Sequence, residues 1–431
     1  MNKEGKAATV MPKFRFPEFS DNTEWQITTL GSLSIPVEKR AGAKKYTLMS
    51  VTSGVGLISQ TEKFGREIAG SAYKNYIVIQ RGDFAYNKSA TKRFPEGYIA
   101  MLADYDEAAL PNSIFTCFRI TDEQVCADFL NRIFQSNYHG SWLRKFIAIG
   151  ARAHGSLNID DKHLWEMPVA LPELPEQQKI ADCLSSLDEL ISAEDKKLEA
   201  LKAHKKGLMQ KLFPAEGKTV PELRFPEFRR SGEWEEKILE QYLRQPPDYG
   251  INAPAVPYSD MLPTYLRITD ISEYGRFIRN KMVSVDKEVT GENYLEEGDI
   301  VFARTGASVG KSYKYDKTDG KLVFAGFLIR VKLDSKKIAT ELLFQFLSTE
   351  QYWRWVNFIS ARSGQPGINI NEYSSMPLVL PKNHKEQQKI ADCLSSLDNL
   401  ITAQVEKIET LKLHKKGLMQ GLFPSIEEVE E

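Results

Sequence analysis

The strongest constraint on the fold of this chain is an internal repeat. Residues 176–214 read EQQKIADCLSSLDELISAEDKKLEALKAHKKGLMQKLFP, and residues 386–424 read EQQKIADCLSSLDNLITAQVEKIETLKLHKKGLMQGLFP. The two stretches are identical at 30 of 39 positions, at a constant offset of 210. A chain of 431 residues that repeats itself once, after half its length, is a duplicated unit and not a solenoid of many short repeats. The sequence therefore predicts two equivalent halves.

Each predicted half contains a short RFPEF segment, a block that differs between the halves, and a copy of the repeat. The divergent blocks keep similar lengths but little identity, which indicates one scaffold that carries two specificities. A chain of this length suits two globular domains, each with its own core. The predicted parts are an N-terminal segment (1–19), a first domain (20–172), a first spacer helix (173–214), a linker with the second RFPEF segment (215–228), a second domain (229–382), a second spacer helix (383–424) and an acidic tail (425–431).

The repeat has the apolar spacing of a coiled-coil helix. In the first copy, apolar residues follow alternating steps of four and three residues, and the second copy repeats the pattern from Ile390 to Leu422. Such a seam predicts that the two helices pack together, each spanning roughly 55 Å. We favour an intramolecular antiparallel pair over a homodimer, because direct repeats packed in this way are related by a pseudo-two-fold axis. The seam of the first copy consists of Ile180, Leu184, Leu187, Ile191, Leu198, Leu201, Leu208 and Leu212.

Polar breaks in the seam and residues at the helix ends lead to more local predictions. Glu194 and Lys415 interrupt the two seams, and we expect them to lie opposite each other and to fix the register. Pro175 suits a first helical turn, whereas residues 383–386 predict a capping box between Asn383 and Glu386. Prolines at 214 and 424 predict the two helix ends.

The two divergent blocks have the pattern of mixed α/β domains. A helix is expected at 121–136, with Thr121 as its N-cap and Gln124 completing a capping box, and another at 339–358. The predicted fold is thus two α/β domains separated by two long antiparallel coiled-coil helices with pseudo-two-fold symmetry. Strands are predicted at 46–51, 76–79, 98–102, 115–120, 300–303 and 322–331.

Bulk composition excludes some classes of protein but does not identify a partner. The 57 basic and 58 acidic side chains leave a net charge of −1, so only local clusters of charge could indicate nucleic-acid binding. The sequence contains no apolar run that could cross a bilayer and begins without a secretory signal, which predicts a cytoplasmic protein. The spacing of the four cysteines favours free thiols over disulfides or a zinc site.

Two glycine-containing loops recur at matching places in the two blocks. The first covers 82–97 and 298–312, and the second covers 150–159 and 360–370. Glycine permits close approach of a partner, and Arg or Lys can bind guanine edges or phosphates, although ordinary surface turns have the same composition. Their recurrence favours a functional interpretation, in which Lys88 corresponds to Arg304. The candidate DNA contacts are Lys44, Lys45, Lys88, Ser89, Lys92, Arg93, Arg152, Arg304, Thr305, Ser308, Lys311 and Arg362.

No motif predicts catalysis by this chain. GASVGKS at 306–312 resembles a phosphate-binding P-loop, but it has three residues between its glycines where the motif requires four. The sequence has no dinucleotide fingerprint and no Asn-Pro-Pro-aromatic tetrapeptide of amino-methyltransferases. Its six histidines are scattered, so we predict no metal site.

With its repeated helices, its RFPEF segments and two unlike blocks between them, the chain resembles the specificity (S) subunit of a type I restriction-modification system. The resemblance covers nearly the whole length. It implies that each block is a target recognition domain that reads one half of a bipartite, asymmetric site in double-stranded DNA, while the paired helices set the unread spacer.

The resemblance also implies a non-catalytic role and defined partners. Two modification subunits would bind S-adenosylmethionine and methylate adenine, and restriction (motor-nuclease) subunits would join through the complex. Any S-adenosylmethionine, ATP and Mg would then be held by the partner subunits and not by this chain. The alternative left open is a duplicated protein-binding scaffold without DNA specificity, and an NTP-dependent enzyme is a weaker third hypothesis.

Overall fold

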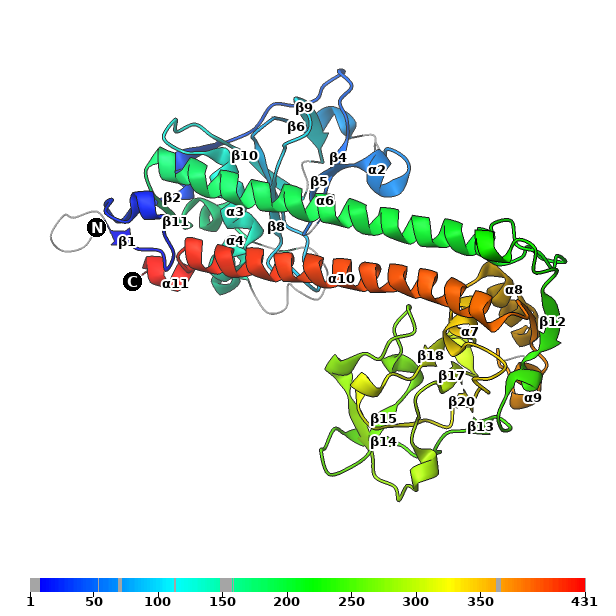
Figure 1. The fold of residues 1–431 in the computed structure, drawn as a ribbon. Helices are drawn as coiled ribbons and strands as arrows, with labels where there is room; N and C mark the ends of the chain where they lie inside the picture. The colour runs from blue at the N-terminus through cyan, green and yellow to red at the C-terminus, as the bar shows by residue number, and fades with distance from the viewer. Residues whose placement is uncertain are drawn as a thin grey trace. The chain divides into compact units, whose positions relative to one another are not determined.

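The computed structural model describes residues 8–52, 54–68, 72–111, 114–147, 157, 159–361 and 366–430. Within it the chain forms two compact units, each of mixed α/β structure (Figure 1). Unit 1 comprises residues 1–195 and 407–431, and unit 2 comprises residues 196–406. Each unit therefore contains one divergent domain together with a part of both spacer helices.

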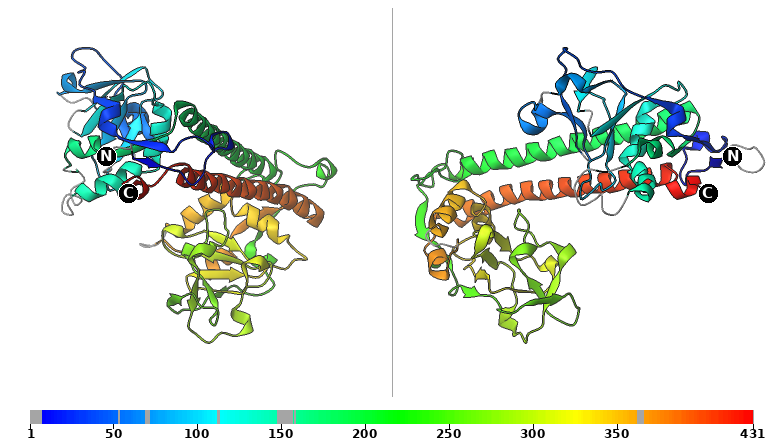
Figure 2. Two further views of the ribbon diagram at one scale, coloured as in Figure 1. Left: turned by 90° about the vertical axis from the view of Figure 1, so that its left-hand side faces the viewer. Right: turned by 180° about the vertical axis from the view of Figure 1, so that it is seen from behind.

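The two spacer helices begin and end within two residues of the predicted ranges. They are α6 (Leu174–Leu212) and α10 (His384–Leu422). In unit 1, the first part of α6 and the last part of α10 lie side by side (Figures 1 and 2). All predicted seam residues are buried or half-buried. None of the helices in the described ranges is both long enough and apolar enough to span a membrane.

The register of the helix pair differs from the predicted one. In unit 1, Lys415 pairs with Asp188, and Glu194 pairs with Lys407, so the expected Glu194–Lys415 contact is wrong. From Asp188 to Glu194 the residue number rises along α6, while that of the paired lysine falls from 415 to 407 along α10. This confirms the antiparallel arrangement within this unit. Asp188 also accepts a hydrogen bond from Arg132 of the first domain at 2.6 Å. This carboxylate therefore joins the helix pair to the domain, and the seam alone could not indicate such a partner.

Unit 2 repeats this contact with the roles of the helices exchanged. Lys205 of α6 lies 2.6 Å from Asp398 of α10, and Gln345 of the second domain donates to the same carboxylate at 2.7 Å. Both residues are equivalent, at the offset of 210, to the Lys and Asp of the unit 1 pair. The same pairing therefore recurs inside each unit.

The RFPEF segments fasten each domain to the start of its spacer helix. Arg15 donates to Glu176 in a bidentate pair with distances of 2.8 and 2.7 Å, and Arg224 does the same to Glu386 at 2.6 and 2.8 Å. Both carboxylates are 1% exposed. The segment and the helix recur together because they form one buried contact.

The predicted capping box of α10 is only half formed. Asn383 accepts a hydrogen bond from the backbone N–H of Lys385 at 2.9 Å, as an N-cap should. Glu386 does not close the box, because its carboxylate is taken by Arg224.

The spacer helices also cap helices of the two domains. Helix α3 begins at Ala127, so the predicted capping box at 121–124 is wrong. Instead the N–H of Cys126 donates to the side chain of Gln177 at 2.8 Å, and in unit 2 the N–H of Ala339 donates to Gln387 at 2.8 Å. The cap comes from another element, which local sequence patterns do not reveal.

A four-stranded antiparallel sheet forms the centre of each domain, with the same order of strands. In unit 1 the order is β3-β10-β7-β8, and in unit 2 it is β13-β20-β17-β18. The predicted strands at 115–120 and 300–303 are confirmed as β10 and β17, whereas the run at 322–331 is divided into β19 and β20 by a turn. The bounds are β3 Ser34–Pro36, β7 Phe84–Asn87, β8 Tyr98–Met101, β10 Phe115–Ile120, β13 Asp248–Tyr249, β17 Ile300–Ala303, β18 Ser312–Lys314 and β20 Leu328–Val331.

Smaller sheets and short helices complete the domains. The sheets are β1-β2-β11, β4-β5 and β6-β9 in unit 1, and β12-β21 and β14-β16-β15-β19 in unit 2. The strand bounds are β1 Thr9–Val10, β2 Trp25–Thr29, β4 Met49–Thr52, β5 Gly56–Ser59, β6 Ile77–Gln80, β9 Glu107–Leu110, β11 Pro168–Leu171, β12 Glu235–Ile238, β14 Ala255–Pro257, β15 Thr264–Leu266, β16 Val283–Val285, β19 Leu322–Phe324 and β21 Pro377–Leu380. The helix bounds are α1 Leu30–Leu33, α2 Gln60–Phe64, α3 Ala127–Gln135, α4 Tyr138–Leu143, α5 Asp161–Trp165, α7 Thr340–Phe346, α8 Glu350–Ser360, α9 Ile370–Ser374 and α11 Ile426–Glu430.

The ends of the spacer helices form part of the domain cores. The core of unit 1 contains residues from the start of α6 and from the end of α10, and that of unit 2 contains residues from the end of α6 and the start of α10. The predicted acidic tail contributes as well, because α11 buries Ile426 and Val429 in the core of unit 1. Each domain is thus anchored on both helices by apolar burial.

Candidate nucleic-acid interface

The Gly-Asp pair that begins the first repeated loop is part of the scaffold. Asp83 accepts a hydrogen bond from the N–H of Gln80 at 2.6 Å, and Asp299 accepts one from the N–H of Glu296 at 3.0 Å. Both carboxylates are buried, and burial raises the pKa of Asp299. Asp83 is balanced by an ion pair with Arg119 at 2.6 Å. The Gly-Asp pair recurs because it shapes the turn before the central strand. Residues that bind a partner are therefore expected later in the loop, after that strand.

The two predicted loops of each block meet at the end of the central strand. In unit 1, β7 ends just before Lys88, whose carbonyl accepts a hydrogen bond from the N–H of Leu157 at 2.8 Å. In unit 2, β17 ends just before Arg304, whose carbonyl accepts one from the N–H of Ile368 at 2.9 Å. The correspondence between Lys88 and Arg304 is therefore structural as well as sequential. The sheet holds both residues at an equivalent place.

Lys88 is occupied by a contact within its own domain. Its Nζ lies 2.6 Å from Oδ1 of Asp161, and its side chain is 22% exposed. The same carboxylate oxygen accepts a hydrogen bond from Thr116 at 2.9 Å. Unit 1 thus neutralises the cation at the end of its central strand.

Arg304 has different surroundings. Its guanidinium carbon lies 4.6 Å from the ring centroid of Tyr249, which follows Asp248 in β13 and is 43% exposed. The backbone N–H of Arg304 donates to the carbonyl of Phe327, a residue that is 59% exposed. Among the described residues no carboxylate lies within ion-pair distance of Arg304. Unit 2 therefore presents a cation over the ring of Tyr249, and the exposed Phe327 contacts its backbone.

The remaining candidates of the first block lie on exposed surface or in surface ion pairs. Lys44 lies 2.9 Å from Glu107, and hydrogen bonds from Lys39 and Lys44 lower the pKa of the Glu107 carboxyl to about 2. Ser89 is half-buried, and its N–H donates to Asn87. Further exposed cations of this block are Lys45, Lys92 and Arg93.

In the second block, the sequence that resembles a P-loop has a different structure. Residues 306–308 form a short 3₁₀ turn, and Lys311 precedes strand β18. A P-loop leads into a helix whose N-terminus faces the phosphates, so this segment lacks the element that the motif needs. Thr305 forms a β-bridge with Gly367, and Ser308 is half-buried. Arg152 and Arg362, the pair predicted for the second loop, lie outside the described residues.

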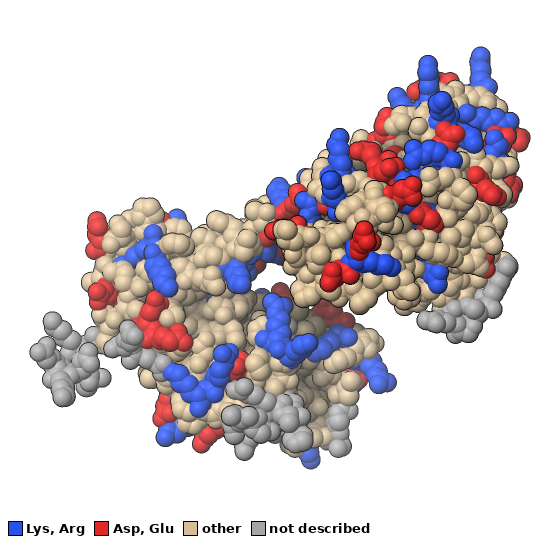
Figure 3. Space-filling view, turned by 90° about the horizontal axis from the view of Figure 1, so that it is seen from below, with Lys and Arg blue, Asp and Glu red and all other residues tan. Residues whose placement is uncertain are grey.

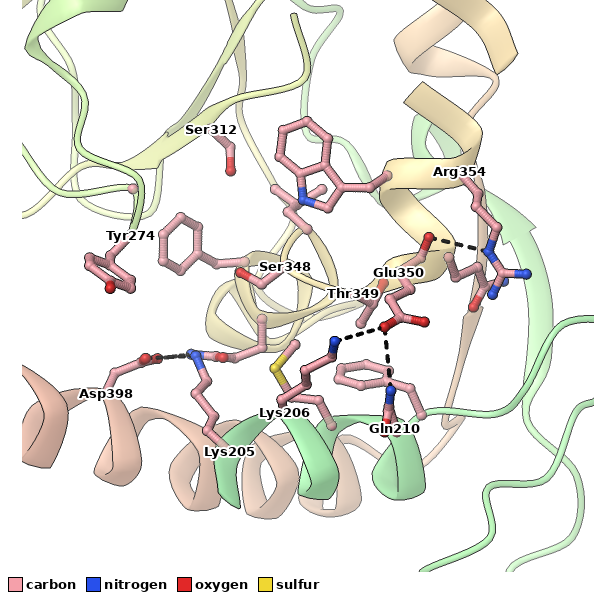
Figure 4. A pocket seen from close by; sticks show the side chains of 18 of the residues that line it. Lys205, Lys206, Gln210, Tyr274, Ser312, Ser348, Thr349, Glu350, Arg354 and Asp398 are labelled. Atoms are coloured by element: carbon pink, nitrogen blue, oxygen red, sulfur yellow. Dashed lines mark hydrogen bonds and ion pairs between the residues drawn. The ribbon is translucent and has the colours of Figure 1, made fainter. Parts of the chain in front are cut away.

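A cavity lies between the spacer helices and the divergent domain in each unit. In unit 2 its volume is about 830 Å³, and Figure 4 shows Lys205 directed at Asp398, with Lys206 and Gln210 directed at Glu350. In unit 1 the volume is about 1240 Å³. Most of the helical wall consists of equivalent residues in both cavities, whereas the opposite wall differs. The shared positions are Asp188/Asp398, Lys202/Lys412, Lys205/Lys415, Lys206/Lys416, Met209/Met419, Gln210/Gln420, Phe213/Phe423 and Pro214/Pro424.

Charge on the surface is mixed. On the face shown in Figure 3, Lys and Arg side chains are interspersed with Asp and Glu and do not form one continuous basic patch. This agrees with the balanced composition, and it indicates that specific groups and not bulk charge would determine any binding.

Tyr249 and Phe327 were absent from the candidates chosen from the sequence. Tyr249 follows a Pro-Pro-Asp run and Phe327 follows Gly326 in a turn, which are weak signals taken singly. Only the pairing of β13 with β20, and of β20 with β17, brings these residues to Arg304 (Figure 1).

Comparisons with known proteins agree with this architecture. The profile of the type I restriction modification DNA specificity domain matches residues 54–203 and 261–413, which together are more than half of the chain. The chain belongs to this family. The two matches to this specificity domain fall one in each half of the repeat, so the duplication seen in the sequence is a duplication of the family's domain.

Individual members of the family show how far the similarity extends. The type I restriction enzyme MjaVIII specificity subunit of Methanocaldococcus jannaschii is 26% identical over 289 residues, which are 64% of this chain and 66% of that protein. The S subunit of the type I restriction-modification system of M. genitalium has a similar fold, with a TM-score of 0.58, 15% identity and coverage of 96% of this chain and 99% of that one. A chain from a type I R-M system, described for its complex assembly and conformational transition, has a TM-score of 0.54, 17% identity and coverage of 92% and 96%.

Proposed function

We propose that this chain is the non-catalytic DNA specificity subunit of a type I restriction-modification complex, and that its two domains read the two halves of a bipartite, asymmetric site. The observation that carries the proposal is that both units contain the same type of sheet, but with different residues at the end of its central strand. The same strand order leads to a neutralised Lys88 in unit 1 and to a stacked Arg304 in unit 2. A fixed scaffold with unlike chemistry at its tip is what two different half-sites require. In this proposal, α6 and α10 set the unread spacer.

The spacer helices supply a reason for two identical partner subunits. Leu190 of α6 is 42% exposed and Leu400 of α10 is 55% exposed, although both are large apolar residues. They occupy equivalent positions of the repeat, and the flanking exposed residues Ser186 and Ser396 are also equivalent. Exposed apolar side chains kept in both copies are typical of a binding surface. We assign one modification subunit to each.

Methylation mapping tests the reading function. The chain is co-expressed with its modification subunits in cells that lack other methyltransferases, and methylated adenines are mapped across the genome. The expected motif has two unlike halves separated by a constant number of unread pairs. Replacing residues 229–382 by the second domain of a relative should change only one half of the motif, and a change in both halves would contradict the two-domain proposal.

Salt dependence separates this function from a protein-binding scaffold. The affinity of the assembled complex for DNA that carries the mapped site should fall steeply as the salt concentration rises, because phosphate contacts release counterions. A protein-binding scaffold without DNA specificity would show neither site preference nor this slope.

Substitution of the exposed leucines tests the docking assignment. Leu190→Asp and Leu400→Asp should each remove one modification subunit, and the double variant should remove both, as measured by the mass of the complex in light scattering. Leu413→Asp is the matched control, because Leu413 is 70% exposed on α10 but has alanine at the equivalent position 203. Loss of partners in the control, or full assembly of the double variant, would place the docking surface elsewhere.

A further inference from the structure

We propose that the second domain reads a guanine through Arg304, and that Tyr249 holds the guanidinium in place for that contact. This inference rests on the proposed function. It adds the identity of one base, and it adds a positioning residue that is not among the sequence-based candidates.

The backbone of Arg304 is fixed on both sides. Its N–H donates to the carbonyl of Phe327 at 3.1 Å, and its carbonyl accepts from the N–H of Ile368 at 2.9 Å. It directly follows β17, which is hydrogen-bonded to strands on both sides. The side chain therefore starts from a rigid point, which a base-reading residue needs.

Tyr249 is held just as firmly next to it. β13 pairs with β20 through Tyr249 and Ile329. The residue after it, Gly250, passes so close to the neighbouring turn that a Cβ would lie 2.2 Å from the carbonyl oxygen of Phe324. Only glycine fits there, because any side chain would collide with backbone. This close passage fixes the backbone next to Tyr249, whose ring lies under the guanidinium of Arg304.

The stacked guanidinium retains its hydrogen-bonding edge. The guanidinium carbon lies over the ring of Tyr249, and no carboxylate among the described residues occupies the N–H groups of Arg304. Two parallel N–H donors match O6 and N7 of guanine in the major groove, whereas the other bases offer no such pair of acceptors there. The geometry thus favours guanine over a phosphate, for which a flexible unstacked cation would serve as well.

Lys88 differs from Arg304 in its surroundings, although both belong to the same protein. It occupies the equivalent place in unit 1, but its Nζ is committed to Asp161 at 2.6 Å. The two domains therefore use the end of the central strand differently. The guanine contact belongs to the half-site read by unit 2.

The test uses the full chain assembled with its modification subunits, and the motif methylated by the wild-type complex is determined first. Arg304→Ala should relax one G·C position in one half of that motif, with about 5- to 150-fold less discrimination there and the other half unchanged. Arg304→Lys keeps the charge but not the planar fork, and it should relax the same position.

Tyr249→Ala should weaken discrimination at that position about 2- to 5-fold, whereas Tyr249→Phe, which keeps the ring, should retain the wild-type discrimination.

Arg244→Ala is the control for loss of an arginine in unit 2, since Arg244 is 58% exposed and pairs with Glu296 at 3.2 Å. Its motif should equal that of the wild type, and unfolding curves check that each variant is folded. Equal weakening on all sequences, relaxation of an A·T position, or an unchanged motif in Arg304→Ala would overturn the guanine assignment. If instead the wild-type complex methylates no bipartite motif, the proposed function itself fails.

Discussion

The buried pair between Arg15 and Glu176 gives the most demanding test of how the domains are fastened to the helices. Arg15→Met keeps the length of the side chain but removes both hydrogen bonds to Glu176, a carboxylate that is 1% exposed. In unit 2, Arg224→Met removes the equivalent bonds. There Glu386 keeps one donor, the indole N–H of Trp234 at 3.3 Å.

Removal of one member of a buried ion pair costs about 3–5 kcal/mol, because the remaining charge stays desolvated and unpaired. Arg15→Met should lie in the upper part of this range, which corresponds to roughly a thousandfold change in the folding equilibrium. Arg224→Met should cost less, by about 1 kcal/mol, since Trp234 still donates to the carboxylate. The free energy of unfolding is obtained from urea titrations followed by circular dichroism.

A second substitution separates charge burial from loss of packing. Adding Glu176→Leu to Arg15→Met should recover most of the stability, because an apolar pair of similar volume replaces a buried ion pair without penalty. If Arg15→Met costs less than about 1 kcal/mol, the value for a surface ion pair, the contact does not fasten the domain and the reasoning is refuted. Failure of the double variant to recover would mean that the arginine acts through packing alone.

Two further predictions concern unit 1 and the helix pair. Burial lowers the pKa of His139 to about 4, from about 6.5 in an unfolded chain, so the unfolded state binds the proton first. Its stabilising contribution is complete above pH 6.5, and about 3 kcal/mol is lost as the pH falls to 4. His139→Tyr should flatten this part of the pH profile of thermal unfolding. Lys205→Met, which leaves Asp398 with Gln345 as a donor but without its cation, should destabilise unit 2 by about 1–3 kcal/mol. Loss of the exposed Lys407 should cost less than about 1 kcal/mol in urea titrations.

The chain contains its own control for the histidine. His139 faces the carbonyl of Gly97 at 3.4 Å, and in unit 2 Tyr352 donates to the equivalent carbonyl of Gly310 at 2.6 Å. Tyrosine is therefore already accepted at this place in the fold. An unchanged acid profile in His139→Tyr would show that other groups determine the acid sensitivity. Equal costs for Lys205→Met and Lys407→Met would show that the register does not depend on the partly buried pair.

Much of the fold could be predicted because it is encoded in local spacing. The seam of α6 and α10 follows from apolar residues at steps of three and four, and β10 and β17 follow from short β-branched and aromatic runs. The predictions that were wrong involve long-range partners. Thr121 does not cap α3, because Gln177 of the spacer helix supplies the cap, and Lys415 pairs with Asp188 and not with Glu194.

The candidate site divides in the same way. The sequence alone predicted that Lys88 and Arg304 correspond, because the glycine-containing loops at 82–97 and 298–312 recur at matching places. Only the tertiary structure decided that Lys88 is neutralised by Asp161 while Arg304 stacks on Tyr249.

The reason for this division is physical. The spacing of apolar residues is a pattern among neighbours along the chain, and it specifies the helices and the central strands. The duplication is visible because one stretch of sequence occurs twice. The environment of a charge depends instead on groups that chain folding brings to it from distant positions. The repeat therefore predicted the features that the two halves share. Packing decided how the halves differ at the end of the central strand, where Lys88 and Arg304 lie.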